Sequence, residues 1–217
     1  TGVATAPVLT LASTTAGAAN FDLGTQANVL GTVSSTNTLN TALLRDDGGF
    51  TLAAVTTDTA VTLQSDGAVD QTGVLTAPVL TLTSTTAGTT TFDLGTQANV
   101  LGTVSSTNTL NTASLRDDGG FTLAAVTTDT SVTLQSNGTV DQTGVLTAPV
   151  LTLTSTTAGT ADFGLGTQAN VLGTVSSTNA LNTASLRDDA GFTLTALVTD
   201  TSVTLLSAAG GTVDQTG

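Results

Sequence analysis

The densest group of charged side chains in this sequence is an Arg-Asp-Asp cluster that occurs three times. Its copies are Arg45-Asp46-Asp47, Arg116-Asp117-Asp118 and Arg187-Asp188-Asp189. Carboxylates beside a guanidinium suit acid–base chemistry on a carbohydrate, and carboxylate oxygens are ligands that Ca²⁺ prefers. The alternative is structural: in a turn, Asp accepts hydrogen bonds from backbone amides while Arg pairs with a carboxylate. We favour the structural role because the cluster recurs unchanged, whereas a catalytic site needs one cleft lined by residues of unlike roles.

The same cluster supplies the candidate metal ligands. No catalytic residue and no cofactor-binding residue is assigned, and Ca²⁺ is the one ion whose binding is considered. Its candidate ligands are Asp46, Asp47, Asp117, Asp118, Asp188 and Asp189.

Side-chain amides form a second recurring set. Its members are Gln26, Asn28, Gln97, Asn99, Gln168 and Asn170. Amides that stack along a sheet form hydrogen-bonded ladders, so we expect these residues to support the structure. A glycan-binding role would need an aromatic platform, and Phe is the only aromatic residue present. We expect the six Phe side chains in the core, because they lie in apolar segments.

Thr-x-Thr pairs, such as Thr81 with Thr83 and Thr152 with Thr154, resemble the arrays of ice-binding solenoids. In such proteins the array recurs in every coil of a flat face. Here the clearest pair occurs once per repeat, and Thr10 is followed by Ala12 in the first copy. Thr is also an ordinary residue at exposed strand positions, which is the simpler interpretation.

The element that positions these residues is a tandem repeat. Gly2, Gly73 and Gly144 begin matching segments 71 residues apart. The copies span residues 1–71, 72–142 and 143–215, and residues 216–217 begin a further copy. The third copy has a two-residue insertion near 208–211, which we place in an outer loop. A fixed period of this kind indicates one continuous solenoid, in which each unit buries its apolar face against its neighbours.

Alternation within a copy predicts strands. In the middle copy, six short segments alternate polar and apolar residues, including one with Val100 and Val104 around Gly102. Turn sequences separate them at 86–88, 117–120 and 137–138. Two segments per coil give three coils per copy, divided as 72–95, 96–118 and 119–142, although two larger coils per copy remain an alternative.

Parallel strands about 4.8 Å apart would make nine such coils a rod about 43 Å long, with equivalent residues about 14 Å apart. The crossover rule favours a right-handed parallel β-helix, also called a β-solenoid, which is an all-β fold. A propeller is excluded, because the period is too long for one blade and three blades would not close a ring.

Composition excludes several functions. The net charge is −13 with three cationic residues, so basic surfaces for nucleic acid or anionic membranes are absent. The absence of Cys removes disulfides, zinc–thiolate sites and thiol catalysis. No run of about 18 apolar residues predicts a membrane span, and the first residues lack the charged region of a signal peptide.

Three phrases resemble the repeats of filamentous-haemagglutinin-like exoproteins, the β-helical adhesins of two-partner secretion in Gram-negative bacteria. They are GVLTAPVLTLT at 144–154, ANVLGTV at 98–104 and LRDDGGFTL at 115–123. The resemblance covers nearly the whole chain. It implies a right-handed rod, export through an outer-membrane transporter to the medium or cell surface, and a role in adhesion, cell contact or biofilm matrix. The amino-terminal secretion domain of that family is not visible in this sequence.

We therefore expect a non-enzymatic structural or adhesive extracellular rod within a long filament. Neither end reads as a capping unit, so the expected neighbours are further copies of the repeat, joined covalently or end to end. Cell-surface or matrix glycans are the other expected partners. The alternatives are an ice- or glycan-binding solenoid, which needs an array in every coil, and a carbohydrate-active enzyme, which needs one copy that differs around a cleft.

Overall fold

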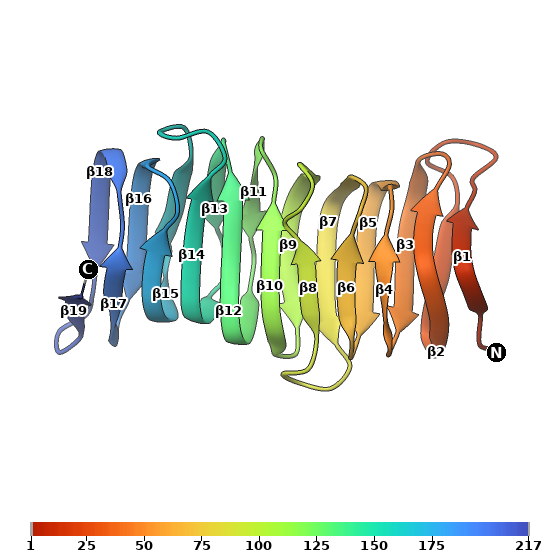
Figure 1. Ribbon diagram of the computed structural model, residues 1–217, viewed down its shortest axis with the longest axis horizontal. Coiled ribbons are helices and arrows are strands. Elements are labelled where there is room, and N and C mark those ends of the chain that lie inside the picture. Colours follow the sequence, from red (N-terminus) through yellow and green to blue (C-terminus); the bar gives the residue numbers. More distant parts are fainter. Residues whose placement is uncertain (1, 217) are drawn as a thin grey trace.

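The alternating segments form strands along the whole chain. The computed structural model describes residues 2–216, which fold into a parallel β-solenoid of about 10 turns without any helix (Figure 1). This confirms the predicted fold class. The strands are β1 (Thr5–Leu11), β2 (Asn20–Ser35), β3 (Leu39–Asp46), β4 (Gly49–Leu52), β5 (Val55–Ser65), β6 (Ala68–Gln71), β7 (Leu75–Ser84), β8 (Thr91–Leu94), β9 (Val100–Thr107), β10 (Leu110–Arg116), β11 (Gly120–Leu123), β12 (Val126–Ser136), β13 (Thr139–Gln142), β14 (Leu146–Ser155), β15 (Asp162–Ser177), β16 (Leu181–Asp188), β17 (Gly191–Ala196), β18 (Thr199–Leu206) and β19 (Thr212–Gln215).

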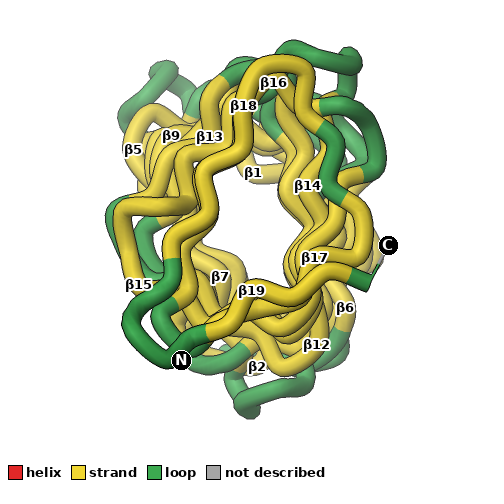
Figure 2. The backbone as a smooth tube through the Cα atoms, turned by 90° about the vertical axis from the view of Figure 1, so that its left-hand side faces the viewer, coloured by secondary structure: helices red, strands yellow, loops and turns green. Residues whose placement is uncertain are grey.

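The strands form two sheets that face each other across the core, and the chain passes from one to the other twice per turn (Figure 2). Sheet A contains β1, the second half of β2, β4, β6, β8, β10, β12, β14, the second half of β15, β17 and β19. Sheet B contains the first half of β2, β3, β5, β7, β9, β11, β13, the first half of β15, β16 and β18. Each strand pairs in parallel with the strand one turn further on.

One copy of the repeat makes three and a half turns, not three. Thr51 lies in sheet A, its equivalent Thr122 lies in sheet B, and Thr193 lies in sheet A again. Along sheet A, seven pairing steps lead from β4 to β17, which are equivalent strands two copies apart. Equivalent residues of successive copies therefore lie on opposite faces, about 17 Å apart along the axis.

The predicted division into coils 72–95, 96–118 and 119–142 is corrected by this register. The middle copy contains seven strands, because Thr139–Gln142 forms β13, which the six alternating segments do not include. Its inward residues are Val140 and the polar Gln142, which conceals the alternation. Turns with tight corners need 19 residues, as from Thr51 to Asp70, and only turns with longer loops reach 24, as from Thr76 to Val100.

The core is a column of inward side chains. Leu80, Leu82 and Phe92 are fully buried, and five of the six Phe side chains are in the core, while Phe21 is partly buried against it. Val100 differs from its prediction, because it is 59% exposed and its neighbour Leu101 is buried. The strand passes close to the preceding turn at Gly102, where an added Cβ would lie 2.2 Å from the carbonyl oxygen of Pro78. This close approach interrupts the alternation.

The insertion of the third copy lies in a loop, as predicted. Residues 207–211 connect β18 to β19, and Thr212 and Val213 regain the pairing with Gly191 and Phe192. Residues 1 and 217 lie outside the described residues, so of the predicted start of a further copy at 216–217 only Thr216 is described.

Candidate functional site

The outer members of the Arg-Asp-Asp cluster form an ion pair at a turn. In the middle copy, Nε and Nη2 of Arg116 donate to Oδ1 and Oδ2 of Asp118, each at 3.0 Å. Hydrogen bonding to Arg116 lowers the pKa of Asp118, and the same bond raises the pKa of Arg116. Both side chains are about one-third exposed. The pairs Arg45–Asp47 and Arg187–Asp189 have the same geometry.

The middle member of the cluster is buried and binds backbone amides. The N–H of Leu101 donates to Oδ2 of Asp117 at 2.5 Å, and the N–H of Gly119 donates to Oδ1 at 2.7 Å. Asp46 and Asp188 make the equivalent bonds. The carboxylate thus joins two neighbouring turns at a corner of the solenoid. This is the arrangement expected of the structural alternative.

The carboxylates of a cluster are therefore directed at different partners. Asp117 accepts from backbone amides of two turns, and Asp118 accepts from a guanidinium. Among residues 2–216, no three acidic side chains converge in a way that could hold a metal ion. Ca²⁺ binding by the six candidate Asp residues remains a prediction for a binding measurement.

The recurring Asn residues lie at corners of the solenoid. Two of them, Asn99 and Asn170, bond to a Gln side chain that the sequence pattern does not identify as a partner. Asn99 is buried and exchanges two hydrogen bonds with the side-chain amide of Gln71, of which the bond from Nδ2 of Asn99 to Oε1 of Gln71 is 3.2 Å. Its Nδ2 also donates to the carbonyl of Leu94 at 2.8 Å, and its Oδ1 accepts the N–H of Leu75 at 2.8 Å. Asn170 makes the same contacts with Gln142.

This corrects the predicted ladder of Gln26, Asn28, Gln97, Asn99, Gln168 and Asn170. Residues of successive copies lie on opposite faces, so these six side chains form no continuous column. Gln26, Gln97 and Gln168 are partly exposed beside the buried Asn residues. In the first copy, Nδ2 of Asn28 donates to the carbonyls of Leu23 and Arg45, at 2.6 and 3.0 Å.

Sequence reasoning missed Gln71 and Gln142. Each lies in the recurring phrase Val-Asp-Gln-Thr-Gly, and each bonds to an Asn 28 residues further along the chain, at the corner that follows the strand paired with its own. Their recurrence was the available signal. The sequence alone does not give the turn lengths, and these determine which Asn lies beside each Gln.

Outward threonines form short rows that change face with each copy. In sheet B, Thr62, Thr81 and Ser105 are neighbours across three turns, and in sheet A the equivalent row is Thr133, Thr152 and Ser176. Each row therefore covers three turns of one face and is followed by different residues. This register therefore does not produce a threonine array that recurs in every coil of one face, as an ice-binding surface would need.

A shallow groove recurs on the flank of the rod. In the first copy it measures about 430 Å³ and lies over Gly31, Gly49, Phe50, Thr51 and Asp70. The third copy has the equivalent groove over Gly173, Gly191, Phe192, Thr193 and Asp214. Both lie on sheet A, seven turns apart. The hydroxyl and carboxylate groups of this groove can hydrogen-bond a polar ligand.

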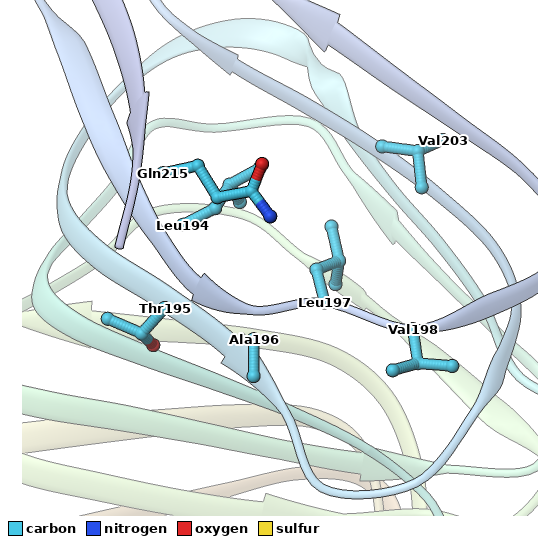
Figure 3. A pocket seen from close by; sticks show the side chains of 7 residues that line it. All are labelled: Leu194, Thr195, Ala196, Leu197, Val198, Val203 and Gln215. Carbon is cyan, nitrogen blue, oxygen red and sulfur yellow. The ribbon is translucent and has the colours of Figure 1, made fainter. Parts of the chain in front are cut away.

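A different kind of hollow opens at the C-terminal turn. It measures about 430 Å³ and is lined by Leu194, Thr195, Ala196, Leu197, Val198, Val203 and Gln215 of β17 to β19 (Figure 3). Its lining is mainly apolar because it is continuous with the solenoid core. The groups that it presents suit packing more than chemistry.

Comparison with known proteins gives no relative. No protein-family model, curated protein or solved structure matches this chain significantly. Residues 2–216 include no helix long and apolar enough to cross a membrane.

Proposed function

We propose that this chain is a non-enzymatic structural rod, part of a long extracellular filament that presents the same surface at regular intervals on two opposite faces. The observation that carries the proposal is the continuous solenoid built from three nearly identical copies. From one copy to the next, each surface feature is rotated by half a turn about the axis of the rod. A site for a ligand or neighbour on one face therefore has an equivalent site on the opposite face. An adhesive role at the surface of a Gram-negative bacterium, after export by a dedicated transporter, rests on the resemblance of the repeat phrases.

The conserved geometry of the charged cluster supports a non-enzymatic role. Its carboxylates and guanidinium are engaged in holding turns together, with bonds of 2.5 to 3.0 Å in the middle copy. Catalytic acid–base pairs need a carboxyl group free to exchange protons with substrate.

The test is electron cryomicroscopy of cells and medium from the source organism, with gold-labelled antibodies against this chain. We expect labelled fibres outside the cell with spacings of about 4.8 Å and about 17 Å along the axis. Labelling confined to the cell interior, or to short capped particles, would contradict an extracellular filament.

The recurring groove supports a second candidate, a glycan-binding rod. Thr51 and Asp70 supply the hydrogen-bonding groups of this groove. Binding to a glycan array that is lost when Asp70, Asp141 and Asp214 are all changed to Ala, but kept in the flank variant Asp22→Ala, would favour this candidate over a purely structural rod. No retention of any glycan by the wild-type chain would exclude it.

A further inference from the structure

Two hollows lie end to end on the outer face of sheet A. The groove of the first copy crosses the second half of β2, β4 and β6. A second hollow, of about 260 Å³, crosses the next three strands of this sheet, β8, β10 and β12 (Figure 1). Its outward side chains are Thr91, Asp93, Thr112, Ser114, Ser131 and Thr133. The two hollows together, called the sheet A trough, cover six consecutive turns of one face.

One column of oxygen-bearing side chains runs along the sheet A trough. Each member lies beside the next across a pair of parallel strands, and none of them is buried. Six members about 4.8 Å apart make a column about 24 Å long. The column consists of Thr32, Thr51, Asp70, Asp93, Ser114 and Thr133. The side chains of Phe50 and Phe92 are buried beneath it, so a ligand in the trough is held by hydrogen bonds and charge and not by ring stacking.

Two carboxylates stand side by side at the centre of this column. Val69 pairs with Phe92, which places Asp70 beside Asp93. Among residues 2–216, no group hydrogen-bonds to the Asp70 carboxylate, and Asp93 accepts only the N–H of Gly95, at 3.4 Å. Like charges directly opposite each other on neighbouring strands destabilise a sheet. A cation supplied by a ligand would relieve this repulsion.

The only cation on the strands of the trough is already engaged. Arg116 of β10 donates two hydrogen bonds to Asp118, each at 3.0 Å. The negative charge of the Asp70–Asp93 pair is therefore not balanced by a salt bridge within residues 2–216.

The opposite face has the same column without the pair. In sheet B the equivalent residues are Thr103, Thr122, Asp141, Gly164, Ser185 and Thr204. Five of the six positions carry the same residue type in both sheets, and Gly164 stands where sheet A has Asp93. The repeat thus folds equally well with one carboxylate, and the adjacent pair is a property of the sheet A trough.

We propose that the sheet A trough binds a linear polysaccharide of amino sugars with free ammonium groups, which lies along the axis of the rod. This rests on the second candidate function, the glycan-binding rod. An ammonium group between Asp70 and Asp93 forms charge-assisted hydrogen bonds with both carboxylates. The flanking Thr and Ser hydroxyls donate to and accept from the hydroxyl groups of neighbouring sugars. Acidic polysaccharides are repelled, because the chain carries a net charge of −13.

Isothermal titration calorimetry on the purified 217-residue chain tests the class of ligand. The probes are a hexamer of glucosamine, which carries ammonium groups, and a hexamer of N-acetylglucosamine, which is the matched neutral sugar. At about pH 5.5 the Asp carboxylates are ionised. We expect the glucosamine hexamer to bind at one site per chain, about tenfold or more tightly than the neutral hexamer, because hydrogen bonds between charged groups are the stronger ones. Its affinity should fall as the salt concentration rises.

Asp70→Asn and Asp141→Asn form a matched pair of variants. They change the same position of the repeat, and both side chains are exposed, but only Asp70 lies beside a second carboxylate. We expect Asp70→Asn to weaken binding of the glucosamine hexamer by about tenfold, and Asp141→Asn to leave it unchanged. Circular dichroism should show the wild-type fold in both variants.

Gly164→Asp provides the converse test, because it adds to sheet B the carboxylate that Asp93 supplies to sheet A. An added Cβ at Gly164 would lie 2.8 Å from Oδ1 of Asp141, which ends a flexible side chain, and 3.7 Å from the carbonyl oxygen of Val140. The fold is therefore expected to persist. We expect the stoichiometry to rise from one glucosamine hexamer per chain to two, at equivalent sites on opposite faces.

Failure of the wild-type chain to bind the glucosamine hexamer, or unchanged binding by Asp70→Asn, would exclude an amino-sugar ligand in the trough. Equally tight binding of a lysine hexamer would also exclude it, because the surface would then recognise charge without sugar. If the neutral hexamer or another glycan binds instead, the amino-sugar proposal fails and the glycan-binding candidate stands. The imaging of fibres outside cells tests the structural rod independently of all these results.

Discussion

The Asp in the middle of each charged cluster is a structural residue, because its carboxylate accepts amides from two turns. We expect Asp117→Asn to destabilise the chain by about 1–3 kcal/mol, since the new amide group must face a buried N–H donor. The control Asp118→Asn loses a partly exposed ion pair and should cost less than about 1 kcal/mol. Urea unfolding followed by circular dichroism measures both. Equal costs for the two variants would show that burial of Asp117 is not decisive.

The exposed ion pair predicts a small pH dependence. The bond from Arg116 holds the pKa of Asp118 below its ordinary value in the folded chain. A depressed folded pKa gives stability that is complete above the unfolded pKa of about 3.9 and is lost as the pH falls through the lower folded value. The stability difference between the wild type and Asp118→Asn should therefore be constant above about pH 5 and shrink below about pH 4. A difference that grows on acidification would contradict this sign.

The side-chain types at the corners were predictable, but their partners were not. The sequence shows Asn99 and Gln97 equally well, yet only Asn99 is buried, with the amide of Gln71 beside it. Asn99→Ala leaves several buried backbone and side-chain groups without a partner, so we expect a loss of about 2–4 kcal/mol. Gln97→Ala should stay within about 0.5 kcal/mol of the wild type, as surface substitutions usually do. Similar losses in the two variants would show that the burial of Asn99 and its bonds to Gln71 do not set its importance.

At the scale of elements, period-2 alternation located six of the seven strands of the middle copy. It failed where a buried polar residue replaces an apolar one, as at Gln142 in β13, and where turns approach closely, as at Val100 and Gly102. Both failures have one cause. Contacts between turns, which a single sequence does not display, override the local pattern.

Glycines at the corners provide a test of these contacts. Gly120 has φ of +96°, and an added Cβ would lie 2.2 Å from the carbonyl oxygen of Thr139 on the next turn. We expect Gly120→Ala to destabilise the chain by more than about 2 kcal/mol, through backbone strain and displacement of that turn. Gly2→Ala is the control, because its Cβ would meet nothing within 4 Å. Thermal unfolding should separate the two variants clearly, and coincident curves would contradict the close approach of the turns.

At the scale of the whole molecule, the number of turns per copy decides what the repeat presents. The sequence defines the 71-residue period, but not the fraction of a turn that it completes, because paired residues of neighbouring turns lie 18 to 24 residues apart, depending on the loops. One overlooked strand per copy changes an integral number of turns into a half-integral one. With three turns per copy, equivalent surface residues would lie on one face of the rod. With three and a half turns, they alternate between two opposite faces.

The half-turn is measurable as distances between spin labels, and the absence of Cys makes the labelling specific. Cysteines at Thr51, Thr122 and Thr193 mark equivalent positions of the three copies. Seven turns separate Thr51 from Thr193 on one face, so their backbones should lie about 34 Å apart. Thr122 should lie on the opposite face, about 17 Å away from each along the axis but further in space, because the two sheets intervene. With three turns per copy, all three labels would instead share one face, at intervals of about 14 Å and a total of about 29 Å. Double electron–electron resonance distinguishes the two arrangements, because only the half-turn makes the Thr51–Thr122 distance far longer than half of the Thr51–Thr193 distance.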